Sequence, residues 1–243
     1  MYLNAIITAA GKGTRMKSDL QKVLHKINEK PMVYYVVEMV KRAGIKEPVV
    51  IVGYQAKKVK KILKDFNCQF VYQKKRLGTG HAVKQAENKL KNKLGYTIIL
   101  YGDVPFFSQK TFHKMVKKIK QTKVKICMTS MILDDPTKGT VLRDKKNNII
   151  SIVEGRNATP EQLKIKEKNV GIYLIDNNWL WKNIDKIEKD PIKGEYYLTD
   201  LVKIASDQGE AIETIILDDH KEGLGVDSRK QLKEANRISE KIN

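Results

Sequence analysis

The chain has 243 residues, 41% of them hydrophobic, which suffices to bury the core of one sizeable α/β domain and excludes a wholly disordered chain. It carries 47 basic and 28 acidic residues, a formal net charge of +19 at pH 7. Such an excess suits a polyanionic partner, but only seven of the basic residues are arginines, and the readout of nucleic-acid bases favours arginine. We therefore interpret most lysines as solvated surface and expect no specific nucleic-acid partner.

The cysteines and the N-terminus bear on the cellular compartment. Cys68 and Cys127 are the only two cysteines, and they lie too far apart in the sequence to form a zinc site with four close ligands, so we predict buried free thiols. The first residues lack the basic segment of a signal peptide, and no apolar run approaches the ~20 residues that a membrane helix needs. We expect a soluble, cytoplasmic protein without a membrane partner.

The first half of the chain alternates short apolar runs with helical patterns. A strand at 3–8 is followed by a glycine-containing loop and by a helix whose first residue we predict to be Pro31. Further strands are predicted at 49–52, 69–72, 97–101 and 125–131, and further helices at 55–64, 80–94 and 109–121. This alternation is typical of a mostly parallel sheet with helices on both faces.

The pattern changes after residue 131. Segments 141–143 and 149–153 flank a polar turn and predict a small antiparallel hairpin. A strand at 170–175, a helix from Asp176, a helix at 198–207 and a strand at 212–217 follow, and Ser228 is expected to cap a closing helix at 228–242. No linker interrupts the chain, so we predict one α/β domain over residues 1–243, with functional halves at about 1–104 and 105–227.

A loop with two glycines directly follows the first strand, in Ala9-Ala-Gly-Lys-Gly-Thr-Arg-Met16. Close glycines let backbone N–H groups approach a phosphate chain, and Lys12 and Arg15 add positive charge. A dinucleotide-binding fingerprint needs a third glycine where Met16 stands, and a P-loop needs a different spacing, so both motifs are excluded. A glycine turn with two surface bases remains the alternative.

Two further segments are weaker signals on their own. Lys22 precedes an apolar pair and is, taken alone, most simply a surface lysine. Gln73 ends the third strand, and Leu77-Gly-Thr-Gly-His-Ala82 opens the next helix. Glycines at such a turn admit a flat base, which a glutamine amide can read with one donor and one acceptor. A tight turn without ligand is the alternative.

Two aspartates are candidate metal ligands. Asp103 follows the strongly apolar strand at 97–101, and Asp227 lies between the last strand and the closing helix. Ligands of α/β sheets bind at the carboxyl ends of the strands, and magnesium takes a few carboxylate oxygens and completes its shell with phosphate and water. Each aspartate could instead cap a helix.

These motifs together resemble a known family. The glycine loop, Ser18-Asp-Leu, Lys22-Val-Leu-His25, Leu77-Gly-Thr-Gly-His-Ala82 and Tyr101-Gly-Asp-Val-Pro105 are similar to the N-terminal uridyltransferase domain of the bifunctional N-acetylglucosamine-1-phosphate uridyltransferase/glucosamine-1-phosphate acetyltransferases. The resemblance continues through Asp134-Asp-Pro-Thr137, Val153-Glu154 and Gly194-Glu-Tyr-Tyr-Leu-Thr-Asp200, in the same order and over almost the whole chain. It implies a Rossmann-like nucleotidyltransferase fold.

The resemblance also implies an activity, the transfer of a uridylyl group from UTP to N-acetylglucosamine 1-phosphate with release of pyrophosphate. It implies Mg²⁺ as cofactor and a homo-oligomer as one possible assembly. The implied roles are catalysis for Arg15 and Lys22; nucleotide binding for Ala10, Gly11, Lys12, Gly13, Gln73, Gly78 and Thr79; sugar binding for Glu154, Asn169, Tyr197 and Thr199; and metal binding for Asp103 and Asp227.

Departures from the family pattern leave alternatives open. Gln21 replaces a proline, Asp227 replaces an asparagine, and Lys138-Gly-Thr-Val141 replaces the Gly-Tyr-Gly-Arg of the sugar-pocket loop. Glucose 1-phosphate or another sugar phosphate is therefore an alternative acceptor, and a UTP sensor without turnover and a basic nucleic-acid-binding protein are remoter readings. Only 16 residues follow Asp227 and no hexapeptide repeats occur, so we expect the acetyltransferase half to be absent.

Overall fold

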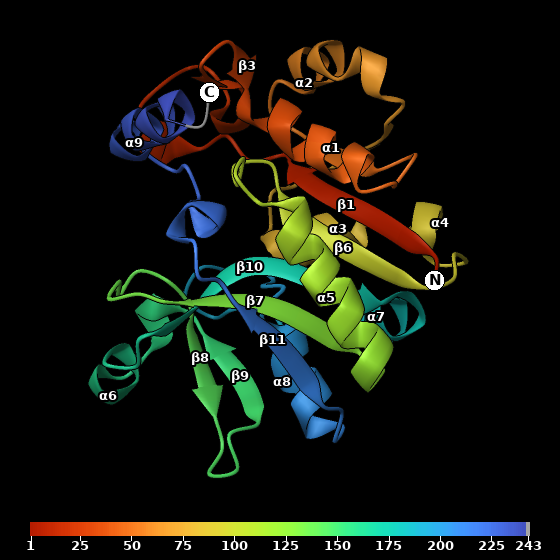
Figure 1. The fold of residues 1–243 in the computed structure, drawn as a ribbon, viewed down its shortest axis with the longest axis vertical. Coiled ribbons are helices and arrows are strands. Elements are labelled where there is room, and N and C mark those ends of the chain that lie inside the picture. The colour runs from red at the N-terminus through yellow and green to blue at the C-terminus, as the bar shows by residue number, and fades with distance from the viewer. Residues whose placement is uncertain (242–243) are drawn as a thin grey trace.

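A mixed sheet runs through the molecule (Figure 1), in a computed structural model that describes residues 1–241. Its central order is β11-β7-β10-β6-β1-β4-β5, with the pair β8 and β9 attached to β10. These strands are β1 (Leu3–Ala9), β4 (Val49–Val52), β5 (Gln69–Tyr72), β6 (Tyr96–Tyr101), β7 (Ile126–Ile132), β8 (Thr140–Arg143), β9 (Ile149–Val153), β10 (Glu167–Asp176) and β11 (Ile212–Ile216).

The sheet is mostly parallel, as the sequence predicts. Strands β1, β4, β5 and β6 run parallel to one another, and β11 runs parallel to β7. Strand β10 is antiparallel to both β6 and β7, and β8 forms the predicted antiparallel hairpin with β9. The carboxyl ends of β1, β5 and β6 therefore meet along one edge, where α/β sheets bind ligands.

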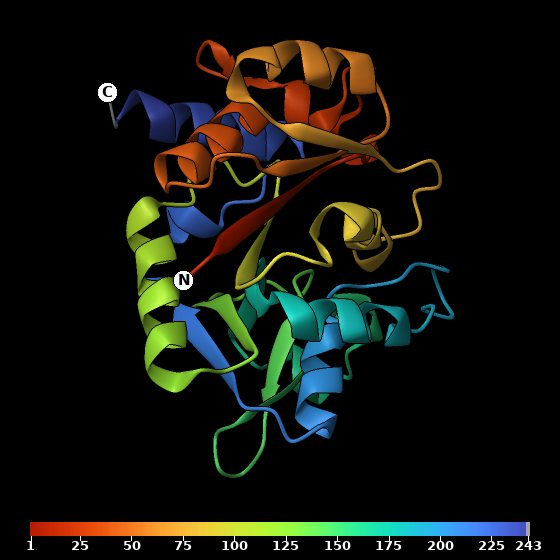
Figure 2. The same ribbon diagram turned by 90° about the vertical axis from the view of Figure 1, so that its right-hand side faces the viewer.

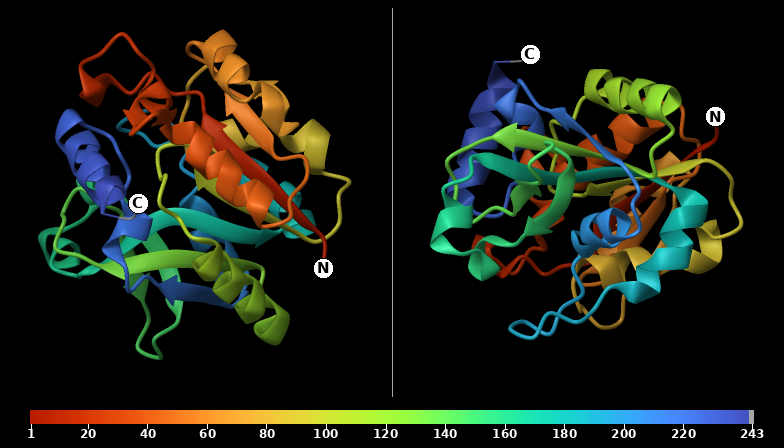
Figure 3. Two further views of the ribbon diagram at one scale, coloured as in Figure 1. Left: turned by 45° about the horizontal axis from the view of Figure 1, so that its top comes forward. Right: turned by 90° about the horizontal axis from the view of Figure 1, so that it is seen from below.

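Helices cover both faces of the sheet (Figure 3). The first face packs against α1 (Met32–Arg42), α2 (Ala56–Ile62) and α5 (Gln109–Thr122). The second face packs against α3 (Thr79–Lys84), α4 (Glu87–Leu90), α7 (Asn177–Asn183) and α8 (Asp200–Asp207). Strand residues with alternate orientation supply the two cores, Ile7 the first and Ile6 the second, because successive side chains of a strand point to opposite faces.

The C-terminal helix packs against the N-terminal part of the chain, at a small hairpin that precedes α1. Helix α9 (Arg229–Glu240) packs beside the small hairpin of β2 (Lys26–Ile27) and β3 (Lys30–Pro31), as Figures 1 and 2 show. The Asn28 amide donates a hydrogen bond to Asn236 Oδ1 at 2.9 Å, and Arg229 Nε donates to the Met16 carbonyl at 3.1 Å. The chain segment just before α9 is thereby held against the loop that follows β1.

Several predicted boundaries were wrong. The helix predicted at 80–94 is interrupted, with α3 ending at Lys84 and α4 at Leu90, and Pro31 precedes α1 as its N-cap. The hairpin β2–β3 and the short helix α6 (Pro160–Leu163) were not predicted. Ser228 caps α9 as predicted, but Ile242, the predicted end of this helix, lies outside the described residues. Short 3-10 turns are found at Thr14–Met16, Lys22–Leu24, Lys64–Phe66, Gly155–Asn157, Ile184–Lys186 and His220–Gly223.

Two remaining sequence predictions concern thiols and membranes. Both cysteines are free, Cys127 being buried and Cys68 partly buried. Within residues 1–241, no helix combines the length and the hydropathy that crossing a bilayer requires.

Strand β10 is longer than predicted and contains an irregularity that shapes the site. Its pairing with β7 shifts register between Asn169 and Tyr173. Gly171 lies in this bulge with φ of +93°, and a β-carbon there would lie 2.4 Å from Cε2 of Tyr101. Only glycine fits, because both the positive φ and the packed Tyr101 ring exclude a side chain.

We predict that Gly171→Ala destabilises the protein by about 3 kcal/mol, through backbone strain plus overpacking. Gly209→Ala is the matched control, because Gly209 also has a positive φ (+74°) but has open space around its α-carbon. Its cost should be only about 1 kcal/mol, from strain alone. Urea unfolding of both variants measures the difference, and equal costs would show that the Tyr101 contact does not matter.

Candidate active site

A cleft of about 950 Å³ opens at the sheet edge where β1, β5 and β6 end. Two of the fifteen candidate residues, Lys12 and Gly13, lie outside its lining. The thirteen that line it are Ala10, Gly11, Arg15, Lys22, Gln73, Gly78, Thr79, Asp103, Glu154, Asn169, Tyr197, Thr199 and Asp227. Tertiary structure thus gathers residues from the whole length of the chain into one cavity.

The two outliers have different surroundings. Lys12 Nζ lies 5.6 Å from the centroid of the Tyr54 ring, a cation–π contact. Gly13 has φ of +76° and does not line the cleft. A β-carbon at this position would lie 2.4 Å from Cβ of Lys22. This glycine therefore lets the backbone of the loop pass close to Lys22.

The side chain of Gln21 supports the glycine loop through hydrogen bonds to its backbone. It is fully buried, and its Nε2 donates hydrogen bonds to the carbonyls of Ala9 (2.7 Å) and Gly11 (3.1 Å). Carbonyls only accept, so these bonds fix the orientation of the amide and leave Gln21 Oε1 buried without a partner among residues 1–241. Gln21 immediately precedes Lys22, so the bonds that hold the glycine loop lie next to the lysine of the charged centre. Sequence reasoning noted this residue only as a departure from a proline.

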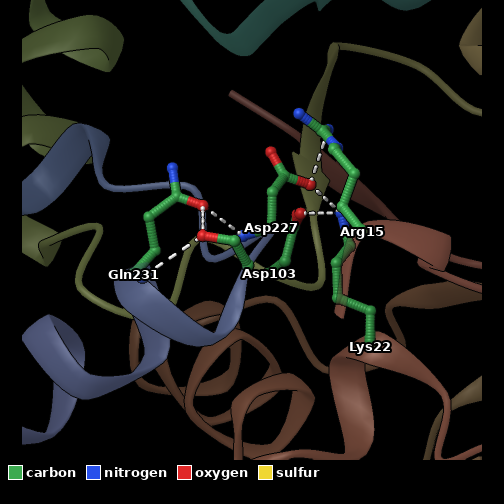
Figure 4. A network of polar contacts seen from close by, with 6 residues as sticks. Arg15, Lys22, Asp103, Asp227 and Gln231 are labelled. Atoms are coloured by element: carbon green, nitrogen blue, oxygen red, sulfur yellow. Dashed lines mark hydrogen bonds and ion pairs between the residues drawn. The ribbon is translucent and has the colours of Figure 1, made fainter. Parts of the chain in front are cut away.

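Four charged side chains form the centre of the cleft (Figure 4). Lys22 Nζ forms ion pairs with Asp103 and with Asp227, the second at 2.5 Å, and Arg15 also pairs with Asp227, at 2.9 Å. Desolvation favours the neutral lysine, but the two carboxylates outweigh it and raise the pKa of Lys22. Burial likewise opposes ionisation of Asp227, yet Lys22, Arg15 and Lys138 lower the pKa of its carboxyl. Both partners are therefore charged at neutral pH.

Backbone contacts bring together Asp103, from the middle of the sequence, and Asp227, from near its C-terminal end. The Val226 amide donates to the Asp103 carbonyl at 2.9 Å, which places Asp227 beside the end of β6. Gln231 Oε1 accepts from the Asp227 amide and from the Ser228 hydroxyl (Figure 4). The N-cap of α9 is Ser228 and that of α5 is Ser108, so neither aspartate serves as a helix cap.

The end of β5 and the start of α3 form one side of the cleft. Gln73 Nε2 contacts His81 Nδ1 at 2.9 Å and lies 3.4 Å from the Gly78 carbonyl oxygen. Gly78 has φ of +98°, and a β-carbon there would lie 2.5 Å from the Tyr196 carbonyl oxygen. The Thr79 hydroxyl accepts a hydrogen bond from the Leu198 amide. The glycine turn therefore packs directly on segment 196–198, and Gln73 is held next to it.

The cleft lining also includes the four candidate sugar-binding residues, two of which, Tyr197 and Thr199, lie in or next to the segment on which the glycine turn packs. Glu154 Oε1 accepts from the Thr199 hydroxyl at 3.2 Å, and burial raises the pKa of Glu154 although Thr199 and Arg156 act against that shift. Asn169 Nδ2 donates to Tyr173 Oη at 2.7 Å, and Asn169 Oδ1 accepts from the Gly171 amide, so this side chain is fixed by the bulge in β10. Tyr197 Oη is buried without a hydrogen-bond partner among the described residues.

Sequence reasoning missed several residues of the cleft. Arg76, Lys138, Arg156 and Lys193 line it as additional cations, and Gln231 lines it beside Asp227. The only signal in the sequence was that Lys138 stands in a loop that departs from the family pattern.

Comparison with known proteins assigns the chain to a family. Residues 5–132, just over half of the chain, match the MobA-like NTP transferase domain. The chain belongs to this nucleotidyltransferase family. Its glycine loop, Asp103 and the other residues up to β7 lie within the matched segment.

Full-length relatives extend the match. The chain is 39% identical over 232 residues to the bifunctional protein GlmU of Exiguobacterium sibiricum, covering 95% of this chain and 51% of that protein. It is 38% identical over 238 residues to the bifunctional GlmU of Oceanobacillus iheyensis, covering 98% and 52%. The chain thus spans about half the length of the curated relatives it matches, and the predicted resemblance is confirmed.

A solved structure supports the fold. A Bacillus anthracis protein assigned as a glucose-1-phosphate thymidylyltransferase, solved in complex with sucrose, superimposes with a TM-score of 0.80. The match covers 100% of this chain and 97% of that one at 22% identity. The predicted Rossmann-like nucleotidyltransferase fold is confirmed.

We predict that Gln21→Met destabilises the protein by about 2 kcal/mol, because the carbonyls of Ala9 and Gly11 lose their donor. Nucleotide binding should weaken as well, since the loop is no longer braced. Gln121→Met makes the same chemical change at an exposed position of α5 and should alter neither property. Urea unfolding and calorimetric titration with nucleotide measure both effects, and a variant as stable as wild type would refute the bracing role.

Proposed function

We propose that this protein transfers a uridylyl group from UTP to N-acetylglucosamine 1-phosphate, giving UDP-N-acetylglucosamine and pyrophosphate. The observation that carries the proposal is the contact of Lys22 with Asp103 and Asp227. This charged cluster lies in a cleft that is also lined by candidate nucleotide-binding and sugar-binding residues. The identity to GlmU proteins over 95–98% of the chain supports the same assignment. We also propose that the enzyme acts in the cytoplasm.

The reaction joins two anions, so charge neutralisation is the main task of the site. An oxygen of the sugar phosphate attacks the α-phosphorus of UTP, a new P–O bond forms, and the bond to the β-phosphate breaks to release pyrophosphate. A phosphate oxygen is already a nucleophile, so no general base is needed. Lys22 neutralises the reacting phosphates, while Arg15, whose side chain is 71% exposed, binds the departing pyrophosphate near the cleft entrance.

The other candidates orient the two substrates. Backbone N–H groups of the loop around Ala10 and Gly11 bind the triphosphate, with Gly13 giving the loop its turn and Lys12 adding charge at its outer side. Gln73, Gly78 and Thr79 read the uracil ring. Tyr197 offers an unpaired hydroxyl to the sugar, and Glu154, Asn169 and Thr199 supply further hydrogen bonds. Fixed orientation of both reactants contributes to catalysis by lowering the entropy cost of their encounter.

The residues of the centre also fit a magnesium ion. The carboxylates of Asp103 and Asp227 both pair with Lys22 Nζ. The two carboxylates therefore surround one position that holds a positive charge. Among residues 1–241, no cluster of three or more His, Cys, Asp or Glu side chains is arranged as a metal site. Two carboxylates suit Mg²⁺, which binds few protein ligands and completes its shell with phosphate and water. Bound there, it would neutralise charge on the phosphates.

A substrate panel tests the proposed function. The purified protein is incubated with Mg²⁺, each of the four common ribonucleoside triphosphates and dTTP, and each of several sugar 1-phosphates, and pyrophosphate release is measured. We expect the highest kcat/KM for UTP with N-acetylglucosamine 1-phosphate. A preference for glucose 1-phosphate would correct the acceptor, and UTP binding without turnover on any acceptor would refute the enzyme.

We predict that Asp103→Asn lowers kcat by about a hundredfold or more, because one preorganised charge of the centre is lost. Its melting temperature should fall because the largely buried Asp103 carboxylate no longer pairs with Lys22, but the variant should still unfold cooperatively, since Asp227 continues to pair with that lysine. Asp218→Asn, which removes a carboxylate whose side chain is 90% exposed, is the matched control and should keep full activity. Near-normal turnover of Asp103→Asn at saturating Mg²⁺ would contradict the metal assignment.

A further inference from the structure

The loop between β7 and β8 projects a lysine into the cleft. Asp135 organises this loop: its Oδ1 accepts from the Thr137 amide and hydroxyl, and its carbonyl accepts from the Lys138 amide at 3.3 Å. The Gly139 carbonyl then accepts from the Asn169 amide at 2.8 Å, which ties the loop to β10. Lys138 is therefore presented from a fixed turn.

The ammonium of Lys138 faces the charged centre without a partner. Within residues 1–241 it forms no hydrogen bond and no ion pair within 4.0 Å, although the side chain is only partly exposed. A β-carbon built on Gly225 would lie 3.7 Å from Lys138 Nζ and 3.9 Å from Asp227 Oδ2, so both groups flank the same backbone position. Lys138 is also one of three cations whose charge stabilises the Asp227 carboxylate.

The same loop borders the candidate sugar-binding residues. A β-carbon on Gly139 would lie 3.6 Å from Cβ of Asn169 and 3.8 Å from Glu154 Oε1. Lys138 thus stands at the junction between the sugar-binding side of the cleft and the carboxylates of the centre. A sugar 1-phosphate likewise has two parts, a sugar ring and a phosphate, and the phosphate is the part that reacts with the nucleotide.

We propose that Lys138 binds the phosphate of the sugar 1-phosphate and selects a phosphorylated acceptor over the free sugar. The inference rests on the proposed function. Lys22 and Arg15 pair with Asp227, whereas Lys138 has no ion-pair partner among residues 1–241 and can contact an incoming anion. A charge-assisted contact between an ammonium and a phosphate is among the stronger hydrogen bonds in proteins.

The test compares Lys138→Met with Lys138→Arg and with Lys145→Met, which removes an exposed lysine of the β8–β9 turn. We expect Lys138→Met to raise KM for N-acetylglucosamine 1-phosphate by about tenfold to a hundredfold, as loss of a hydrogen bond to a charged group does. Its KM for UTP should change by less than about threefold. Lys138→Arg should keep most of the affinity, and Lys145→Met should match wild type.

Direct binding separates this inference from the proposed function. Calorimetry with N-acetylglucosamine 1-phosphate and with unphosphorylated N-acetylglucosamine measures what the phosphate contributes to binding. Lys138→Met should weaken binding of the phosphorylated sugar and leave the free sugar unchanged. Equal weakening of both, or a larger effect on UTP, would overturn the role of Lys138 even if the enzyme turns over. Absence of turnover in wild type would refute the proposed function, while the calorimetric comparison would still decide the inference.

Discussion

The site depends on two carboxylates that share one lysine ammonium at the carboxyl edge of the sheet. Asp103 and Asp227 would repel each other if left alone, and their side chains are only 12% and 18% exposed. Lys22 and Arg15 offset that repulsion: the carboxylates raise the pKa of Lys22, and the two cations lower the pKa of Asp227, so this lysine and this aspartate stay charged. The same charged groups that stabilise one another here are ones that phosphates and a divalent cation can bind.

The fold is built to keep these charges together. Asp103 lies just after strand β6, and Lys22 lies in the turn after the glycine loop. Asp227 lies just before α9, which packs on the hairpin of β2 and β3. Helix α9 is held there by hydrogen bonds of Arg229 to the Met16 carbonyl and of Asn236 to the Asn28 amide. The terminal helix is therefore part of the active-site scaffold, because losing it would remove the position of Asp227.

The sequence predicted the parts of the structure that depend on local pattern. Apolar runs marked most of the strands, and Asp103 lies just beyond the end of one of them, as its position in the sequence predicts. The ion pair between Lys22 and Asp227 joins residues 205 positions apart, and no local pattern encodes such a contact. The sequence also did not predict that Gln21 supports the glycine loop or that Lys138 points into the cleft. Both features depend on how distant segments pack.

The most direct test of the account is whether the carboxylate pair is a cation site that Lys22 now fills. Mn²⁺ binding to the nucleotide-free protein can be followed by the loss of the free Mn²⁺ signal in electron paramagnetic resonance. Removing the lysine charge in Lys22→Met should tighten Mn²⁺ binding by about tenfold or more, given the strength of charge interactions at this distance. Adding Asp103→Asn to that variant should abolish the gain. Unchanged Mn²⁺ affinity in Lys22→Met would contradict the account.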